Sequence, residues 1–106
     1  MTVVSVAKQF TRFPAGRYKK FGDTSGEAFR ERFLEQALRG GEDIVIDLDG
    51  TVGYGSSFLE EAFGGVVRSL NIPASEVLKH LTIRSADSSL VEEINDYIRE
   101  ADGRRR

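Results

Sequence analysis

Two aspartates and two serines in one short stretch carry the most obvious chemistry of the chain. Asp47 and Asp49 lie in and just after the apolar run Ile44–Leu48, and Ser56 and Ser57 follow a glycine-rich loop. Paired carboxylates could hold Mg²⁺ and accept a phosphoryl group, or they could fix the loop by accepting its backbone amides. Serines at the start of a helix could cap it, or could be phosphorylated if they are exposed.

Three elements must position these residues. The β-branched run Ile44–Leu48 is too short for a helix and predicts a buried strand. The loop Asp49–Gly55 contains three glycines, and a helix follows it with apolar residues at helical spacing. Ser57 and Glu60 have the spacing of a capping box, in which Ser57 caps the helix. Ser56 would then stay exposed at the positive end of the helix dipole.

The N-terminal part of the chain predicts a pair of strands. Thr2–Phe10 indicates a first strand, and Arg17–Phe21 a short second strand that pairs with it. Phe13–Gly16 has the composition of a turn between them. Cations alternate with aromatic residues in the second strand, as on a solvated sheet edge. We expect a basic patch there, either solvated or in contact with an acidic partner, that consists of Arg12, Arg17, Lys19 and Lys20.

Two further helices and a last strand complete the pattern. A capping box at Thr24 opens a first helix, which ends at Gly40–Gly41. The solvent side of this helix is expected to hold Arg30, Glu31, Arg32 and Glu35. Leu81–Arg84 predicts the last strand, and a capping box at Ser89 opens the last helix.

The order β-β-α-β-α-β-α predicts an α/β fold with a mixed sheet of about four strands covered by helices. The length fits one domain over residues 1–103, followed by a frayed basic tail at 104–106. Gly64–Gly65 lowers the helix propensity of the second helix. We attribute these glycines to close packing on the sheet or on the first helix; the alternative is a partner that lies close against them.

Charge and composition narrow the function classes. Residues 1–40 carry eight lysines and arginines against four acids, whereas residues 41–103 carry four against thirteen. Such polarity suits the orientation of a protein partner and does not favour nucleic-acid binding. The chain has no cysteine, no apolar run long enough to span a membrane and no signal-peptide core. We therefore expect a cytoplasmic protein without membrane or thiolate-metal chemistry.

The run Val45–Thr51 resembles the first motif of haloacid-dehalogenase-type phosphatases. This resemblance implies Asp47 as phosphoryl acceptor, Asp49 as acid and base, and Mg²⁺ as cofactor. The rest of the chain fits that family poorly, because this strand is not the first and the segment Arg84–Asp87 at the end of the last strand offers only one further acid, Asp87. A phosphate-binding loop at Gly50–Ser57 is another alternative, but it lacks the P-loop lysine and adjoins two aspartates with no cation to offset them.

The segment Asp47–Leu59 resembles the signature of STAS domains, the anti-sigma-factor antagonist family. That signature is an aspartate at a strand end, a short loop, and a serine pair that opens a helix. The blocks Ala15–Tyr18, Ser25–Arg30 and Asp47–Gly65 together resemble the STAS-like domains of unknown function. The order of elements resembles that fold through the last helix.

The STAS resemblance implies a non-catalytic, bacterial-type regulatory module that binds a protein and needs no cofactor or metal. It implies phosphorylation of Ser56, with Ser57 as the cap, by a partner kinase with a GHKL-type ATP site. The implied partner is such a kinase or an anti-sigma factor. Gly55 stands where the family has Asp, so binding without phosphorylation is an alternative.

The contact residues that we expect are Asp49, Gly53, Tyr54, Gly55, Ser56 and Phe58. Tyr54 has an equal alternative, in which it folds back onto the sheet.

Overall fold

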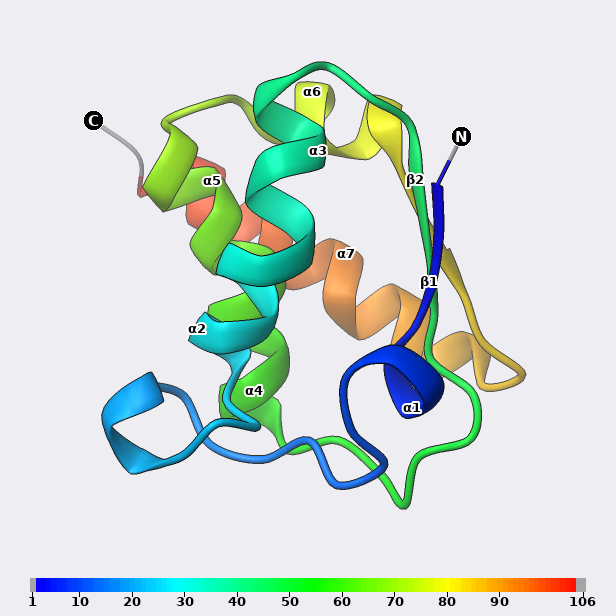
Figure 1. Cartoon of the computed structure of the whole chain (residues 1–106). Coiled ribbons are helices and arrows are strands. Elements are labelled where there is room, and N and C mark those ends of the chain that lie inside the picture. The colour runs from blue at the N-terminus through cyan, green and yellow to red at the C-terminus, as the bar shows by residue number, and fades with distance from the viewer. Residues whose placement is uncertain (1, 105–106) are drawn as a thin grey trace.

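The computed structural model describes residues 2–104, and a parallel sheet of three strands forms one side of the molecule (Figure 1). The strands lie side by side in chain order: β1 (Thr2–Ser5), β2 (Ile44–Asp47) and β3 (Leu81–Arg84). Val4 pairs with Ile46, and Ile46 pairs with Ile83. The strands are rich in β-branched residues, which pack well on a pleated surface.

Two long helices are each interrupted by a π-helical segment. The first consists of α2 (Gly26–Phe29), the π-helix η2 (Arg30–Leu34) and α3 (Glu35–Arg39). The second consists of α4 (Ser56–Leu59), the π-helix η3 (Glu60–Gly64) and α5 (Gly65–Leu70). The remaining helical elements are α1 (Val6–Gln9), the 3₁₀ turn η1 (Lys19–Phe21), α6 (Ala74–His80) and α7 (Ser88–Gly103).

The two long helices and α7 lie on one side of the sheet (Figure 1). Val4, Ile44 and Ile46 point into this layer and are at most 3% exposed. They belong to one core that includes the rings of Phe29 and Phe63. None of the helices within residues 2–104 combines the length and the apolar character needed to cross a bilayer.

The expected strand pair at the N-terminus is wrong. The first strand ends at Ser5, because its hydroxyl accepts the amide of Lys8 at 3.2 Å and starts α1. In the segment expected as a second strand, Arg17–Phe21, residues Lys19–Phe21 form η1 instead. Its backbone follows the start of α2, where Glu27 donates its amide to the carbonyl of Arg17. The sheet of residues 2–104 therefore has three parallel strands, and neither the four-stranded mixed sheet nor its element order is correct.

The helix caps also differ from the predicted capping boxes. Ser25 caps α2 in place of Thr24, and Asp87 caps α7 in place of Ser89. The last strand, Leu81–Arg84, agrees with its predicted bounds. The fraying expected at 104–106 concerns mainly positions 105 and 106, which lie outside the described residues.

Gly26 sets how closely α2 approaches α4. A Cβ atom at this position would collide with the carbonyl oxygen of Phe58 and lie 3.1 Å from the amide nitrogen of Ala62. The two backbones are therefore in direct contact, and only glycine fits between them.

We predict that Gly26→Ala lowers the free energy of unfolding by about 2–3 kcal/mol, because the helices must move apart. Urea denaturation followed by circular dichroism would measure this loss. Gly103→Ala is the matched control, since a Cβ atom there meets nothing within 4 Å. A Gly26→Ala protein as stable as its parent would show that the backbones do not touch.

Candidate functional site

The two aspartates at and just after the end of β2 accept hydrogen bonds from backbone amides. Asp47 accepts the amide of Asp49 at 3.0 Å, and Asp49 accepts the amide of Ala86 at 3.0 Å. The first bond fixes the turn after β2, and the second ties this turn to the connection after β3. The interpretation of both carboxylates as loop anchors is therefore confirmed.

A cleft of about 450 Å³ lies beside these aspartates, at the carboxyl ends of β1 and β2. It is lined by Ser5, Ala7, Lys8, Arg12, Asp47, Asp49 and Gly50. Lys8 and Arg12 are cations that the sequence argument did not place near the carboxylates. Among residues 2–104, no group of three or more His, Cys, Asp or Glu side chains could hold a metal ion. This donor set does not match the Mg²⁺ site that a dehalogenase-type phosphatase would need.

Tyr54 folds back onto the end of the strand. Its hydroxyl donates to the carbonyl of Leu48 at 2.8 Å, and its ring centroid lies 5.9 Å from that of Phe58. Burial raises the pKa of Tyr54 to about 12, and the carboxylates of Asp47 and Asp49 act in the same direction. Of the two alternatives for Tyr54, the structure therefore has the folded-back one.

The serine pair lies at the start of the second long helix, with both residues exposed. The helix begins at Ser56, and Gly55 is its N-cap, with extended backbone and no capping side chain. Ser57 as the cap is therefore wrong, because it already lies within the first turn. Glu60, the other half of the predicted capping box, binds arginines instead. Ser56 is nevertheless free of a capping role, as the sequence argument required.

Phe58 cannot be a surface contact, which corrects its place among the expected partner-binding residues. Its side chain is 1% exposed and lies among the rings of Phe10, Phe29 and Tyr54. The first turn of this helix thus exposes Ser56 and Ser57 and buries Phe58 in the core.

Two loops run along the edge of the molecule that contains Ser56 (Figure 1). They are residues 10–25 and 49–55, and the amide of Val52 joins them by donating to the carbonyl of Arg12 at 2.9 Å. The described residues expose five large apolar side chains, of which four lie on these loops: Phe13, Tyr18, Phe21 and Val52. Phe13, Phe21 and Val52 are 63%, 73% and 69% exposed. We call these two loops with Ser56 the loop edge.

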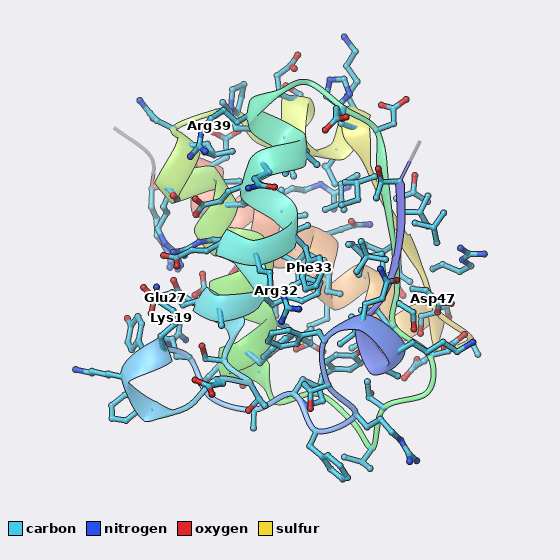
Figure 2. All side chains as sticks on the ribbon, viewed as in Figure 1. Lys19, Glu27, Arg32, Phe33, Arg39 and Asp47 are labelled. Atoms are coloured by element: carbon cyan, nitrogen blue, oxygen red, sulfur yellow. The ribbon has the colours of Figure 1, made fainter. Side chains whose placement is uncertain are left out.

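The expected basic patch is divided among different contacts. Arg12 lines the cleft, and the ammonium of Lys20 lies 5.1 Å from the ring centroid of Phe21. Lys19 binds the carboxylate of Glu31 at 2.6 Å, and its amide binds Glu27 (Figure 2). Arg17 points inward to the second long helix. A continuous solvated patch of all four cations is therefore wrong.

A cluster of buried charges joins the two long helices, and sequence reasoning did not foresee that Glu60 and Glu61 take part in it. Arg30 of η2 donates to Glu61 of η3 at 2.6 Å and to Glu35 at 2.8 Å. The residues Arg30 and Glu61 are only 8% and 7% exposed. Arg30 and Glu35 were expected on the solvent side of their helix, and that expectation is wrong. π-Helical segments often occur at functional sites, and here the two segments supply the two members of the buried pair.

Arg17 extends this cluster to the loop edge. It pairs with Glu60 and lies 3.3 Å from Glu61, and Arg68 also binds Glu60 at 2.6 Å. Burial alone would raise the pKa of Glu60, but hydrogen bonds from Arg68 and Arg17 lower it below its ordinary value. In residues 2–104, every buried side-chain nitrogen and oxygen has a hydrogen-bond partner. The polar cluster is therefore fully satisfied.

Gly65 is the residue in the sequence that indicates close packing next to this cluster. A Cβ atom there would lie 2.8 Å from the Arg30 guanidinium, so glycine makes room for the arginine. The expected close packing on the first helix is thus confirmed for Gly65, whereas Gly64 packs against the backbone carbonyl of Tyr97 in α7 and the carboxylate of Glu60. The identity of the packed group could not be predicted, because an arginine is ordinarily expected in solvent even where its helical position, four residues after Gly26 and four before Leu34, is a buried one.

Comparison with known proteins gives one match. The model of the family described as STAS-like domain of unknown function (DUF4325) matches residues 25–91, which is more than half of the chain. These residues run from the cap of α2 to the start of α7. No curated protein and no solved structure shows a significant match.

We predict that Glu61→Gln lowers the free energy of unfolding by about 3 kcal/mol, because it leaves the charge of Arg30 buried with one carboxylate fewer. Arg39→Ala is the control. Arg39 pairs with Glu35 at 3.5 Å but is 64% exposed, so its loss should cost less than about 0.5 kcal/mol. Equal costs in urea denaturation for the two variants would contradict a buried, tightly coupled pair.

We predict that Tyr54→Phe costs about 1 kcal/mol at pH 7 through the lost hydrogen bond. The parent should also lose stability as the pH rises from 10 to about 12, because unfolding lets Tyr54 ionise at its ordinary pKa of 10. Tyr54→Phe should lack this part of the alkaline loss. Urea midpoints at pH 7 and pH 11 would measure both effects, with Tyr18→Phe as the exposed control. The same alkaline loss in Tyr54→Phe would show that this phenol is not perturbed.

Proposed function

Because the chain belongs to the family of STAS-like domains of unknown function, we propose that it is a non-catalytic regulatory module that binds a protein partner through the loop edge. The observation that carries this proposal is that two adjoining loops expose four large apolar side chains, and that one of these loops leads directly to the exposed Ser56. Isolated exposed apolar residues are ordinary, but several on adjoining loops mark an interaction surface.

The chemistry of the loop edge suits a partner surface with acidic and apolar groups. Arg12 and Lys20 flank the exposed Phe13 and Phe21, so apolar anchors are bordered by cations. Aromatic side chains that fill a pocket on the partner supply much of the affinity in such interfaces, while border charges guide the encounter. Asp47 and Asp49 serve this surface by fixing the loop that carries Val52.

We further propose that phosphorylation of Ser56 switches the interaction. Ser56 opens a helix that continues to Leu70, and the positive helix end favours a phosphate there. The same phosphate would place about −1.5 to −2 charges inside an interface and disrupt it. The STAS resemblance suggests a GHKL-type serine kinase or an anti-sigma factor as the partner. Gly55 stands where the STAS family has Asp, so in this switch no carboxylate precedes Ser56.

The test is capture of the partner from native lysate on immobilised protein, followed by affinity measurement with the purified partner. Ser56→Glu should weaken binding at least ~10-fold, and Val52→Asp should do the same. Ser75→Glu is the matched control, because Ser75 is an exposed serine in the first turn of α6, outside the loop edge.

Intact-mass measurement of the protein from its native host tests the switch separately. One phosphate is expected, and Ser56→Ala should remove it. A partner that binds Ser56→Glu and Val52→Asp as tightly as the parent would show that the interface is elsewhere.

A further inference from the structure

The proposed interface leaves the cleft at the carboxyl ends of β1 and β2 unused, and only Arg12 belongs to both. The cleft has a volume of about 450 Å³, which lies within the range of small-molecule sites. In open α/β sheets, ligands bind beyond the carboxyl ends of the parallel strands. Figure 2 shows Asp47 at this end of the sheet. The cleft therefore has the size and the place in the fold of a ligand site.

Both walls of this cleft are held in place by contacts within the chain. On one wall, the hydroxyl of Ser5 accepts the amide of Lys8 at 3.2 Å and so fixes the start of α1. On the other wall, Gly50 has a φ of +99°, and a Cβ atom there would lie 3.0 Å from the Cβ of Ala7. Glycine thus lets the turn after β2 approach α1 closely. The cleft is therefore formed before any ligand binds.

The cleft carries two charges of each sign. Lys8 and Arg12 supply the cations, and neither forms an ion pair in the part of the chain that the structure describes. Asp47 and Asp49 each accept a backbone amide with one oxygen, which leaves the second oxygen as an acceptor. Arg84 is the neighbour of Asp47 on β3, but it lines a separate hollow on the open face of the sheet. The four charges of the cleft therefore stay available to a ligand.

This charge pattern selects against ligands of a single sign. A phosphate ion would meet two carboxylates, and an amine or a metal cation would meet a lysine and an arginine. An ammonium group, in contrast, donates up to three hydrogen bonds, which the free carboxylate oxygens can accept. A carboxylate accepts two parallel hydrogen bonds from a guanidinium such as that of Arg12. A molecule with one group of each kind leaves none of these charges unpaired.

We propose that this cleft binds a small zwitterion of the amino-acid class. Its ammonium group binds the carboxylates of Asp47 and Asp49, and its carboxylate binds Arg12 and Lys8. The ligand bridges α1 and the turn after β2. Because Ser56 and the exposed apolar side chains do not line the cleft, the proposal does not rest on the proposed function.

Isothermal titration calorimetry of the purified protein with defined probes tests this binding. The zwitterionic probes are the protein L-amino acids, β-alanine and 4-aminobutanoate, in which the two charged groups lie progressively farther apart. Acetate, inorganic phosphate and methylammonium are the probes of a single sign. At least one zwitterion should bind with a Kd below ~1 mM, and at least ~10-fold more tightly than every single-sign probe at equal ionic strength. A protein that binds no zwitterion this tightly, or binds a single-sign probe equally well, overturns the proposal.

Two variants test whether the zwitterion occupies the cleft. Asp47→Asn removes a charge but keeps an oxygen that can accept the amide of Asp49, and Arg12→Ala removes the guanidinium. Each should weaken binding of the tightest zwitterion at least ~10-fold. The matched controls are Asp96→Asn and Arg99→Ala on α7, whose side chains are 68% and 61% exposed and lie outside the cleft. Both controls should bind like the parent.

Arg12→Ala keeps the test decisive if Asp47→Asn does not fold, because the exposed side chain of Arg12 forms no ion pair that the fold would lose. An unchanged circular dichroism spectrum would show that the variant is folded. Zwitterion binding that Arg12→Ala leaves at the affinity of the parent overturns the assignment to this cleft.

Discussion

The buried ion pair between Arg30 and Glu61 is the constraint on which the arrangement of the helices depends. Each side chain comes from a π-helical segment of a long helix, and the two meet where both are almost fully buried. Burying charge is costly unless every polar atom is paired, and here Glu35 completes the arginine's contacts. The pair therefore restricts how the two long helices can be placed relative to each other. Two glycines make room for this arrangement. Gly26 allows the backbones of the two long helices to touch, and Gly65 leaves space for the guanidinium of Arg30.

This constraint extends outward to the loop edge. Arg17 reaches from the loop into the same cluster, while the carbonyls of Gly16 and Arg17 accept the first amides of α2. The loop that bears the exposed aromatic residues is thus fixed by charge at one end. The second loop is fixed by Asp47, Asp49 and the phenol of Tyr54. A surface held in this way is preorganised, so binding to it costs less ordering entropy.

Patterns that depend on neighbouring residues were readable in the sequence. The strands Ile44–Asp47 and Leu81–Arg84, the stop at Gly40–Gly41 and the exposed Ser56 followed from β-branched runs, glycine placement and helical spacing. The family resemblance was also readable, because its motif lies in one continuous stretch.

Features set by distant contacts were not readable. Arg17–Phe21 alternates like an edge strand, yet it lies against the helices, where Lys19 binds Glu27 and Arg17 binds Glu60, 43 residues away. The capping box at Ser57 failed for the same reason, since Arg17 and Arg68 occupy Glu60. Arg30 lies four residues before the buried Leu34, on the buried face of its helix, but arginine is ordinarily expected in solvent and its partner Glu61 lies 31 residues away.

Native-state hydrogen exchange in Arg17→Met tests most directly whether the charge cluster holds the loop edge as one unit. Arg17 touches Glu60 and Glu61, so its loss should loosen both helix starts together. We predict that the amides of Gly26 and Glu27, and that of Leu59 in α4, all exchange at least ~10-fold faster than in the parent. Faster exchange confined to Gly26 and Glu27, with Leu59 unchanged, would contradict the account.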